Sequence, residues 1–246
     1  MIRLDAATVL LHWSTGGLLF GWYTNRNRDI GPGYAKLLRL VYATLAIAAV
    51  VCGVRYGIVP VREFASGALV LAAIATYRKS TPRLDLVATI LGVIGLIAAG
   101  IVAANDAGSS DVAVSLARVL VGAAFLGSVS DAMLLGHWYL VQPGMPRRLI
   151  NELITVVIWI WPAEMLVLLL PTGMISVLNG SIDDGWNGVL GWFWLASAVV
   201  TGVLAVVTRA ALKERSYSAV MAATGLMYLA ILTAFCTDIV GRALLS

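Results

Sequence analysis

The sequence predicts an all-α polytopic membrane protein with eight transmembrane helices in a four-plus-four bundle and both termini on the external side. An apolar composition, eight long apolar runs and an alternation of basic residues along the chain lead to this prediction. The 246 residues are 60% hydrophobic and only 12% charged. A soluble domain of this length cannot bury so much apolar surface, so residues 1–246 are expected to form one integral membrane domain.

The apolar runs set the number of helices. A helix needs about 20 apolar residues to cross a hydrocarbon core of about 30 Å. Suitable runs occupy residues 5–24, 34–54, 64–78, 84–104, 112–141, 147–171, 187–208 and 217–243, of which the third is short and the fifth is long. No signal-peptide pattern is expected before the first run, because Met1–Asp5 leads directly into it.

Basic residues set the orientation. Connections that follow odd-numbered runs hold twelve of the 17 Lys and Arg residues, and the other side holds five. Basic loops stay in the cytoplasm, so both termini and the acidic turns near Asp106 and Asp183 are expected outside an inner (cytoplasmic) membrane. The net charge of +4 then reflects topology, and no nucleic-acid partner is expected. The twelve are Arg26, Arg28, Lys36, Arg39, Arg78, Lys79, Arg83, Arg147, Arg148, Arg209, Lys213 and Arg215, and the five are Arg3, Arg55, Arg62, Arg118 and Arg242.

An internal repeat favours the four-plus-four plan. The segments Ile30-Gly-Pro-Gly-Tyr-Ala-Lys and Val141-Gln-Pro-Gly-Met-Pro-Arg each place Pro-Gly and then a basic residue at the cytoplasmic start of a helix. Pro-Gly is also a common turn dipeptide, so the repeat supports the plan without establishing it.

Ionisable residues inside the apolar runs are the candidates for a site. A charged group in the middle of a bilayer costs at least a few kcal/mol, so such residues usually face the bundle interior and carry a function. The alternative is a polar contact that only joins two helices. At about 1.5 Å of rise per residue, one set is expected near the external face, His12 lying about 10 Å below it. This set comprises His12, Glu164, Asp238, Arg242, Arg118 and Arg55.

Two relationships refine these candidates. Asp238 and Arg242 are four residues apart with the acid first, which is the favourable order for an ion pair on one helix. A second set, His137 and Glu152, is expected near the cytoplasmic face, with Asp131 deeper in the membrane. Asp131 precedes His137 by six residues, so the two should lie on different sides of their helix.

The positions of the His and Cys residues in the sequence argue against metal cofactors held by this chain alone. The two histidines, each followed by Trp, suggest a bis-histidine haem b. However, His12 and His137 are expected near opposite faces, so they cannot ligate one iron. Cys52 and Cys236 both lie in apolar runs without the spacing of an iron–sulfur or zinc site. Neither haem b nor a metal is therefore expected within the chain.

A quinone fits the external set better. Its head group needs a hydrogen-bond partner at each carbonyl, and its chemistry needs a proton donor or acceptor, which a His and a carboxylate supply together. The expected quinone or proton site comprises His12, Glu164, Asp238, Arg118 and Arg242, with His137, Glu152 and Asp131 as secondary candidates. The alternative is that Glu164 pairs with Arg118 or Arg55 and has only a structural role.

The end of the chain carries a resemblance to a known family. The segment Thr237-Asp-Ile-Val-Gly-Arg-Ala-Leu-Leu, together with eight helices and external termini, resembles the membrane anchor subunits of polysulfide-reductase and dimethyl-sulfoxide-reductase type complexes. The resemblance implies quinone exchange near the external face. It also implies electron transfer to or from an attached iron–sulfur subunit.

The expected function is that of a membrane subunit of a respiratory or related redox complex, exchanging electrons and protons with a quinone pool. No residue is assigned a catalytic role, so catalysis would require iron–sulfur or haem partner subunits. Two alternatives remain open. One is a non-catalytic anchor or scaffold of a larger complex, and the other is a proton-coupled small-solute transporter that uses Asp131, Glu164 and Asp238.

Overall fold

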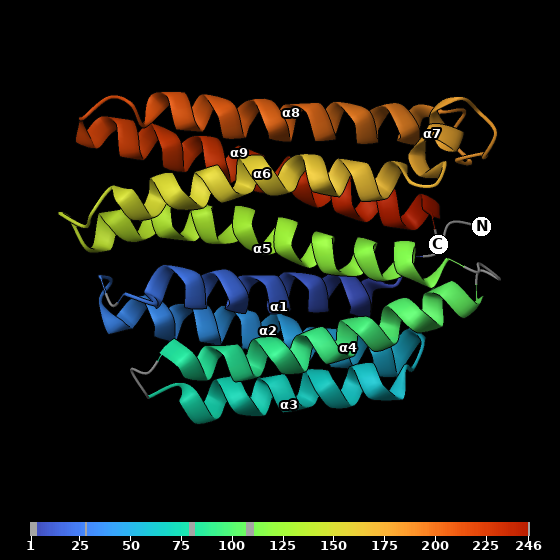
Figure 1. The fold of residues 1–246 in the computed structure, drawn as a ribbon, viewed down its shortest axis with the longest axis horizontal. Coiled ribbons are helices and arrows are strands. Elements are labelled where there is room, and N and C mark those ends of the chain that lie inside the picture. The colour runs from blue at the N-terminus through green and yellow to red at the C-terminus, as the bar shows by residue number, and fades with distance from the viewer. Residues whose placement is uncertain (1–3, 28, 79–81, 107–110, 246) are drawn as a thin grey trace.

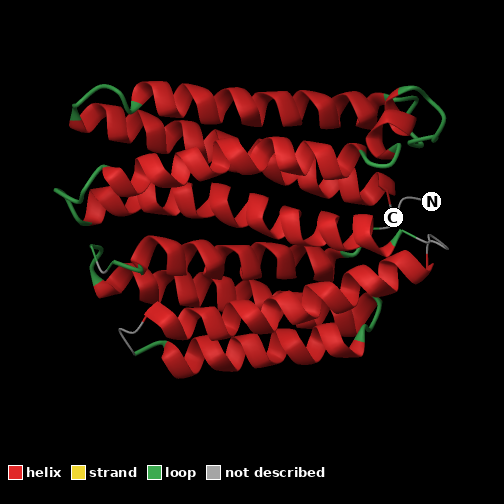
Figure 2. Cartoon of the chain, viewed as in Figure 1, coloured by secondary structure: helices red, strands yellow, loops and turns green. Residues whose placement is uncertain are grey.

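The computed structural model describes residues 4–27, 29–78, 82–106 and 111–245. Arg3, Arg28 and Lys79, together with the side chain of Asp106, lie outside this description. The described chain is helical, with connecting loops gathered at the two ends of the molecule and no strand among the described residues (Figure 2). The elements are α1 (Ala6–Asn25), α2 (Pro32–Tyr56), α3 (Pro60–Thr76), η1 (Pro82–Leu84), α4 (Asp85–Asp106), α5 (Val112–Val141), α6 (Arg148–Leu169), α7 (Gly173–Leu178), α8 (Val189–Ala211) and α9 (Tyr217–Leu245).

Each apolar run of the sequence corresponds to one long helix, with boundaries that agree within a few residues. Six of these helices, α2, α4, α5, α6, α8 and α9, are long and apolar enough to cross a membrane. The other two, α1 with 20 residues and α3 with 17, run alongside them (Figure 1). The composition of the six apolar helices indicates a multi-pass membrane protein in a lipid bilayer.

The long helices form two rings of four. In the first ring α1 contacts α2, α2 contacts α3, α3 contacts α4, and α4 returns to α1. In the second ring α5, α6, α8 and α9 make the same cycle of contacts, and the rings meet mainly between α1 and α5 (Figure 1). This is the arrangement that the Pro-Gly repeat suggests.

The bundle has two chemically different ends. The "terminal end" carries the first and last described residues, Leu4 and Leu245, and the connections on either side of α7 (Figure 1). The "basic end" carries the connections α1–α2, α3–α4, α5–α6 and α8–α9. The described basic residues expected in the cytoplasm gather in or beside these connections, and they are Arg26, Lys36, Arg39, Arg78, Arg83, Arg147, Arg148, Arg209, Lys213 and Arg215.

Small residues let the two rings approach closely. A β-carbon at Gly16 of α1 would collide with the carbonyl oxygen of Ala123, and one at Gly127 would collide with the backbone of Gly16. Ala123 and Gly127 are four residues apart, which is the small-xxx-small spacing typical of close helix crossings in membranes. The crossing of α1 and α5 therefore depends on the absence of side chains at Gly16 and Gly127.

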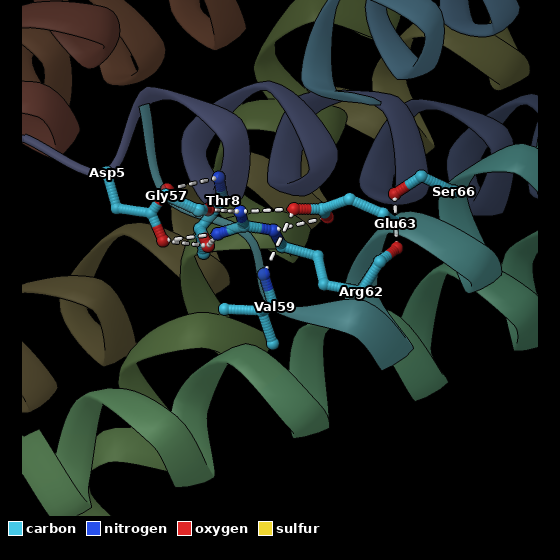
Figure 3. A network of polar contacts seen from close by, with 7 residues as sticks. All are labelled: Asp5, Thr8, Gly57, Val59, Arg62, Glu63 and Ser66. Atoms are coloured by element: carbon cyan, nitrogen blue, oxygen red, sulfur yellow. Dashed lines mark hydrogen bonds and ion pairs between the residues drawn. The ribbon is translucent and has the colours of Figure 1, made fainter. Parts of the chain in front are cut away.

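An arginine network fastens the first ring at the terminal end (Figure 3). Arg62, at the start of α3 and only 1% exposed, donates to Asp5 at 2.6 Å and to Thr8 at 3.0 Å on α1. It also donates to the carbonyl of Gly57 at 2.7 Å and to Glu63 at 2.8 Å. All the groups around this guanidinium are accounted for within the fold, so Arg62 has a structural role.

The connection between α6 and α8 is partly buried. It contains α7, whose Met174 and Val177 are 0% and 2% exposed and pack with Leu168 and Trp194 in a second apolar core. Trp194 is only 2% exposed. Burying these apolar side chains closes the terminal end of the second ring.

Candidate functional site

The site is built around an ion pair on α9. The Nε of Arg242 donates to Oδ1 of Asp238 at 2.7 Å, one helical turn earlier on the same helix. The Asp238 side chain is 0% exposed and that of Arg242 is 12% exposed. The ion pair that the spacing predicts is thus present, and it lies inside the bundle near the terminal end.

His12 reaches this pair from the other ring. Its Nδ1 lies 4.0 Å from Oδ2 of Asp238, and both side chains are fully buried. This distance is too long for a hydrogen bond, and neither His12 nitrogen has a hydrogen-bond partner among the described residues. Next to it, the rings of Trp13 and Phe235 meet edge to face at 4.7 Å and hold α1 against α9.

Glu164 of α6 approaches the same pair from a third helix. Its Oε1 lies 3.5 Å from Nη2 of Arg242, and its side chain is 0% exposed. Neither carboxylate oxygen has a hydrogen-bond partner among the described residues. His12 and Glu164 therefore lie at two sides of the Asp238–Arg242 pair, His12 beside the carboxylate and Glu164 beside the guanidinium.

Arg118 of α5 takes part mainly through its backbone. The Nη2 of Arg242 donates to the carbonyl of Arg118 at 2.8 Å. The Arg118 side chain instead donates to the carbonyls of Val167, at 3.1 Å, and Leu170 at the end of α6. Arg118 thus joins α5 to α6 and orients Arg242, and it forms no ion pair with Glu164 in the described structure.

Arg55 does not belong to the cluster, contrary to its expected place in the external set. Its guanidinium is exposed and lies 5.3 Å from the centre of the Tyr56 ring at the end of α2. The depth of Arg55 is similar to that of Arg118, but its helix lies in the first ring away from α6. The partner of Glu164 is therefore Arg242, and neither of the two expected arginines pairs with it.

Gly122 is a part of the site that the sequence analysis missed. A β-carbon at Gly122 would collide with Nη2 of Arg242 and would lie 2.9 Å from Oδ1 of Asp238. The absence of a side chain here is what lets the guanidinium reach α5. A signal was available, because Gly122 follows Arg118 by four residues and so shares its helix face.

The completed cluster, named here the "ion cluster", comprises His12, Glu164, Asp238, Arg242 and Arg118. Two buried carboxylates contact the guanidinium of Arg242, while the guanidinium of Arg118 is directed at backbone carbonyls at the end of α6. Buried charges are costly inside a membrane unless they are paired and hydrogen-bonded. The free nitrogens of His12 and free oxygens of Glu164 can donate to or accept from a ligand.

A second buried polar group surrounds Asp131 of α5. The hydroxyl of Tyr42, on α2, donates to Oδ1 of Asp131 at 2.7 Å and lies 3.0 Å from the hydroxyl of Ser130. The carboxylate is fully buried, and its Oδ2 has no hydrogen-bond partner among the described residues. The tyrosine partner comes from α2, and depth along the sequence gave no indication of it.

His137 and Glu152, the other secondary candidates, are not brought together. His137 is exposed and its Nδ1 lies 3.5 Å from the Tyr228 hydroxyl on α9. Glu152 instead forms ion pairs with Arg26 at 3.1 Å and Arg148 at 3.5 Å at the basic end. The two side chains leave α5 and α6 in different directions, so the structure does not bring these two candidates into one site.

The cofactor expectations can be compared with this geometry. His137 follows Gly122 by fifteen residues on α5, which corresponds to about 22 Å along the helix, while His12 lies beside the pair that Gly122 accommodates. The two histidines are too far apart to hold one haem iron between them. Among the described residues no group of three or more His, Cys, Asp or Glu side chains is arranged to hold a metal ion, and Cys52 and Cys236 are unpaired thiols.

Comparisons with protein-family models, with curated proteins and with solved structures find no match to this chain. The resemblance of its last residues to redox-complex anchor subunits thus remains an expectation. The functional argument rests on the geometry of the ion cluster.

Proposed function

We propose that the chain is a membrane subunit of a respiratory or related redox complex, and that its ion cluster exchanges protons with a quinone. One observation carries the proposal. Helices from both rings bring His12 and Glu164 to the buried Asp238–Arg242 pair, where the His12 nitrogens and the Glu164 oxygens have no hydrogen-bond partner among the described residues. Unmatched groups of this kind inside a membrane usually mark a substrate or proton site.

The chemistry of a quinone matches these groups. Reduction of a quinone to a quinol takes two electrons and two protons, one proton for each carbonyl oxygen. In the proposal His12 and Glu164 supply hydrogen bonds and protons, and Arg242 balances the charge of the carboxylates. The electrons come from, or go to, an iron–sulfur or haem partner subunit, to which this chain contributes the membrane part.

The orientation belongs to the same proposal. All eight long helices cross an inner (cytoplasmic) membrane, the basic end faces the cytoplasm and both termini lie outside. The gathering of ten described basic residues at one end supports this orientation. The ion cluster then lies on the external side of the membrane.

The test measures binding of a short-chain ubiquinone analogue to the purified chain. Binding is monitored as quenching of the tryptophan fluorescence. Glu164→Gln should weaken binding of the reduced analogue about tenfold or more, because a quinol hydroxyl loses its charge-assisted hydrogen bond to a carboxylate in a dry site. In the complete complex the same variant should lower quinone-linked turnover by about 10²–10⁴-fold. Glu152→Gln is the matched control, since Glu152 lies in half-exposed ion pairs at the basic end and should bind like the wild type.

The opposite result identifies a structural cluster. In that case Glu164→Gln binds the analogue and turns over normally but has a lower melting temperature, because Arg242 loses a partner. The chain would then act as an anchor or scaffold. A mass-spectrometric inventory of proteins that co-purify in mild detergent tests the redox partners directly.

A proton-coupled small-solute transporter is the second candidate. It is favoured by Asp131, a buried carboxylate with a free oxygen at a different depth from the ion cluster. A transporter would purify alone as a monomer or dimer, without redox partners. It would also bind no quinone analogue at the ion cluster.

A further inference from the structure

We propose that Asp131 is an intramembrane proton-transfer site that connects the ion cluster with the basic end of the bundle. The proposal goes beyond the exchange of protons with a quinone, because it concerns proton movement through the chain and holds whatever reacts at the ion cluster. It rests on a column of buried polar side chains along α1, α2 and α5.

Asp131 has the features of a proton carrier. Its carboxylate is fully buried, accepts one hydrogen bond from Tyr42 and has a free Oδ2. None of the ion pairs described in this structure involves Asp131, whereas Asp238 and Glu164 both contact Arg242. An isolated carboxylate charge is costly in a membrane interior, so a bound proton stabilises this position and its release requires a nearby acceptor.

The Asp131 group lies beside α1, close to His12. The Tyr42 ring packs so tightly against Gly17 that a β-carbon at Gly17 would overlap it. Gly17 follows His12 by five residues, which is about 7.5 Å along α1. The Tyr42 side chain that binds Asp131 therefore contacts α1 about one and a half turns beyond His12, in the direction of the basic end.

Three buried hydroxyl side chains lie on α1 and α5 within one turn of Gly17 or Asp131. Ser14 and Ser128 are 0% exposed and Thr15 is 2% exposed. Ser14 donates to the carbonyl of Tyr42 at 2.7 Å, while the Thr15 hydroxyl, which lies beside Gly92 of α4, has no hydrogen-bond partner among the described residues. Buried polar atoms of this kind commonly bind ordered water, which can pass protons between hydroxyls and carboxylates.

The column continues toward the basic end. The Tyr34 hydroxyl lies 3.4 Å from the carbonyl of Asp131, and its side chain is fully buried. Thr24 interacts with Tyr34, and Asn25 follows at the end of α1. Thr24 and Asn25 are 2% and 6% exposed, and the next residue, Arg26, has a partly exposed side chain. Polar groups thus extend from Asp131 to the aqueous surface at this end.

The experiment measures proton flux through the full chain in liposomes. An internal pH-sensitive dye reports protons that enter when a potassium gradient and valinomycin impose an inside-negative potential. The wild type should acidify the interior faster than protein-free liposomes. Asp131→Asn should reduce the flux about tenfold or more, as expected for loss of a positioned proton donor and acceptor.

Two further variants keep the test decisive. Asp131→Glu retains the carboxyl group and should restore part of the flux, which a merely structural role would not require. Tyr42→Phe should also slow the flux, and it decides the question if Asp131→Asn fails to fold. Glu214→Gln, exposed in the connection between α8 and α9 at the basic end, should conduct like the wild type.

Two outcomes would overturn the proposal: a wild type that conducts no better than protein-free liposomes, or Asp131→Asn that folds and conducts like the wild type. Quinone binding separates this proposal from the proposed function. Asp131→Asn should bind the quinone analogue normally, and Glu164→Gln should not.

Discussion

The guanidinium of Arg242 occupies the space that a side chain at Gly122 would fill. Nη2 of Arg242 lies so close to the Cα of Gly122 that an added β-carbon would collide with it. The same nitrogen donates to the carbonyl of Arg118 at 2.8 Å and lies 3.5 Å from Glu164. The geometry of the ion cluster therefore depends on a glycine that carries no charge.

Gly122→Ala should displace Arg242 without removing any ionisable group. The added methyl group separates the guanidinium from α5 and lengthens its contacts with Asp238 and Glu164. Overpacking a tight contact typically costs about 1–3 kcal/mol, so the melting temperature in detergent should fall and quinone-analogue binding should weaken. Gly225→Ala is the control, because a β-carbon there meets nothing within 4 Å. Equal behaviour of the two variants would show that Arg242 can move at no cost.

The orientation can be checked with single cysteine probes. In a background of Cys52→Ala and Cys236→Ala, Ser216→Cys lies between α8 and α9 at the basic end, and Ser181→Cys lies beyond α7 at the terminal end. Membrane-impermeant maleimide should label Ser216→Cys only after the cytoplasmic face is opened, and Ser181→Cys in intact cells. The reverse pattern would invert the orientation, and labelling of both probes from one face would contradict the crossing of the membrane by α8, which lies between them.

The separation of the two histidines leads to a spectroscopic prediction. The subunit expressed alone should show no b-type α band after reduction with dithionite, because His12 and His137 cannot ligate one iron. His12→Ala and His137→Ala serve as controls. A band that disappears in either variant while the fold is retained would contradict the argument.

Ionisation of Asp184 should make the stability of the folded protein depend on pH in the acid range. It is 1% exposed and accepts backbone hydrogen bonds at the start of α8 from Trp186 at 2.9 Å, Gly188 and Leu190 at 2.8 Å, and Gly191 at 3.3 Å. Burial acts to raise the pKa of this carboxyl, but the backbone N–H groups outweigh burial and hold the pKa of Asp184 below its ordinary value.

The direction in which stability changes with pH follows from this lowered pKa of Asp184. The stabilisation by ionised Asp184 is complete above the unfolded-state pKa of about 4 and is lost as the pH falls through the lower folded-state pKa. Asp184→Asn should therefore melt below the wild type at neutral pH, and the difference should shrink in acid. Asp183→Asn is the control, because exposed Asp183 accepts only one such bond, from Gly185 at 2.8 Å. A difference independent of pH would refute the assignment.

The sequence by itself determined the helices and the depth of their polar residues. Apolar runs of about 20 residues must form helices in a bilayer, because every backbone polar group needs a partner there. A fixed rise of 1.5 Å per residue then predicts depth. These two rules located the long helices and placed His12, Glu164 and Asp238 in one layer, and the four-residue spacing predicted the pair of Asp238 and Arg242.

Only the tertiary structure decided which residues at one depth are neighbours. Arg55 and Arg118 have similar depths, yet only Arg118 lies on a helix that packs against α6 and α9. Likewise the side chains of His137 and Glu152 point in different directions, while Asp131 accepts a hydrogen bond from Tyr42 on α2.

The lateral position of a residue depends on which helix faces pack together. That choice is fixed by close approach of helices at glycines such as Gly16, Gly122 and Gly127. The contacts of these glycines involve residues far apart in the sequence, so hydropathy and charge patterns carry no record of them.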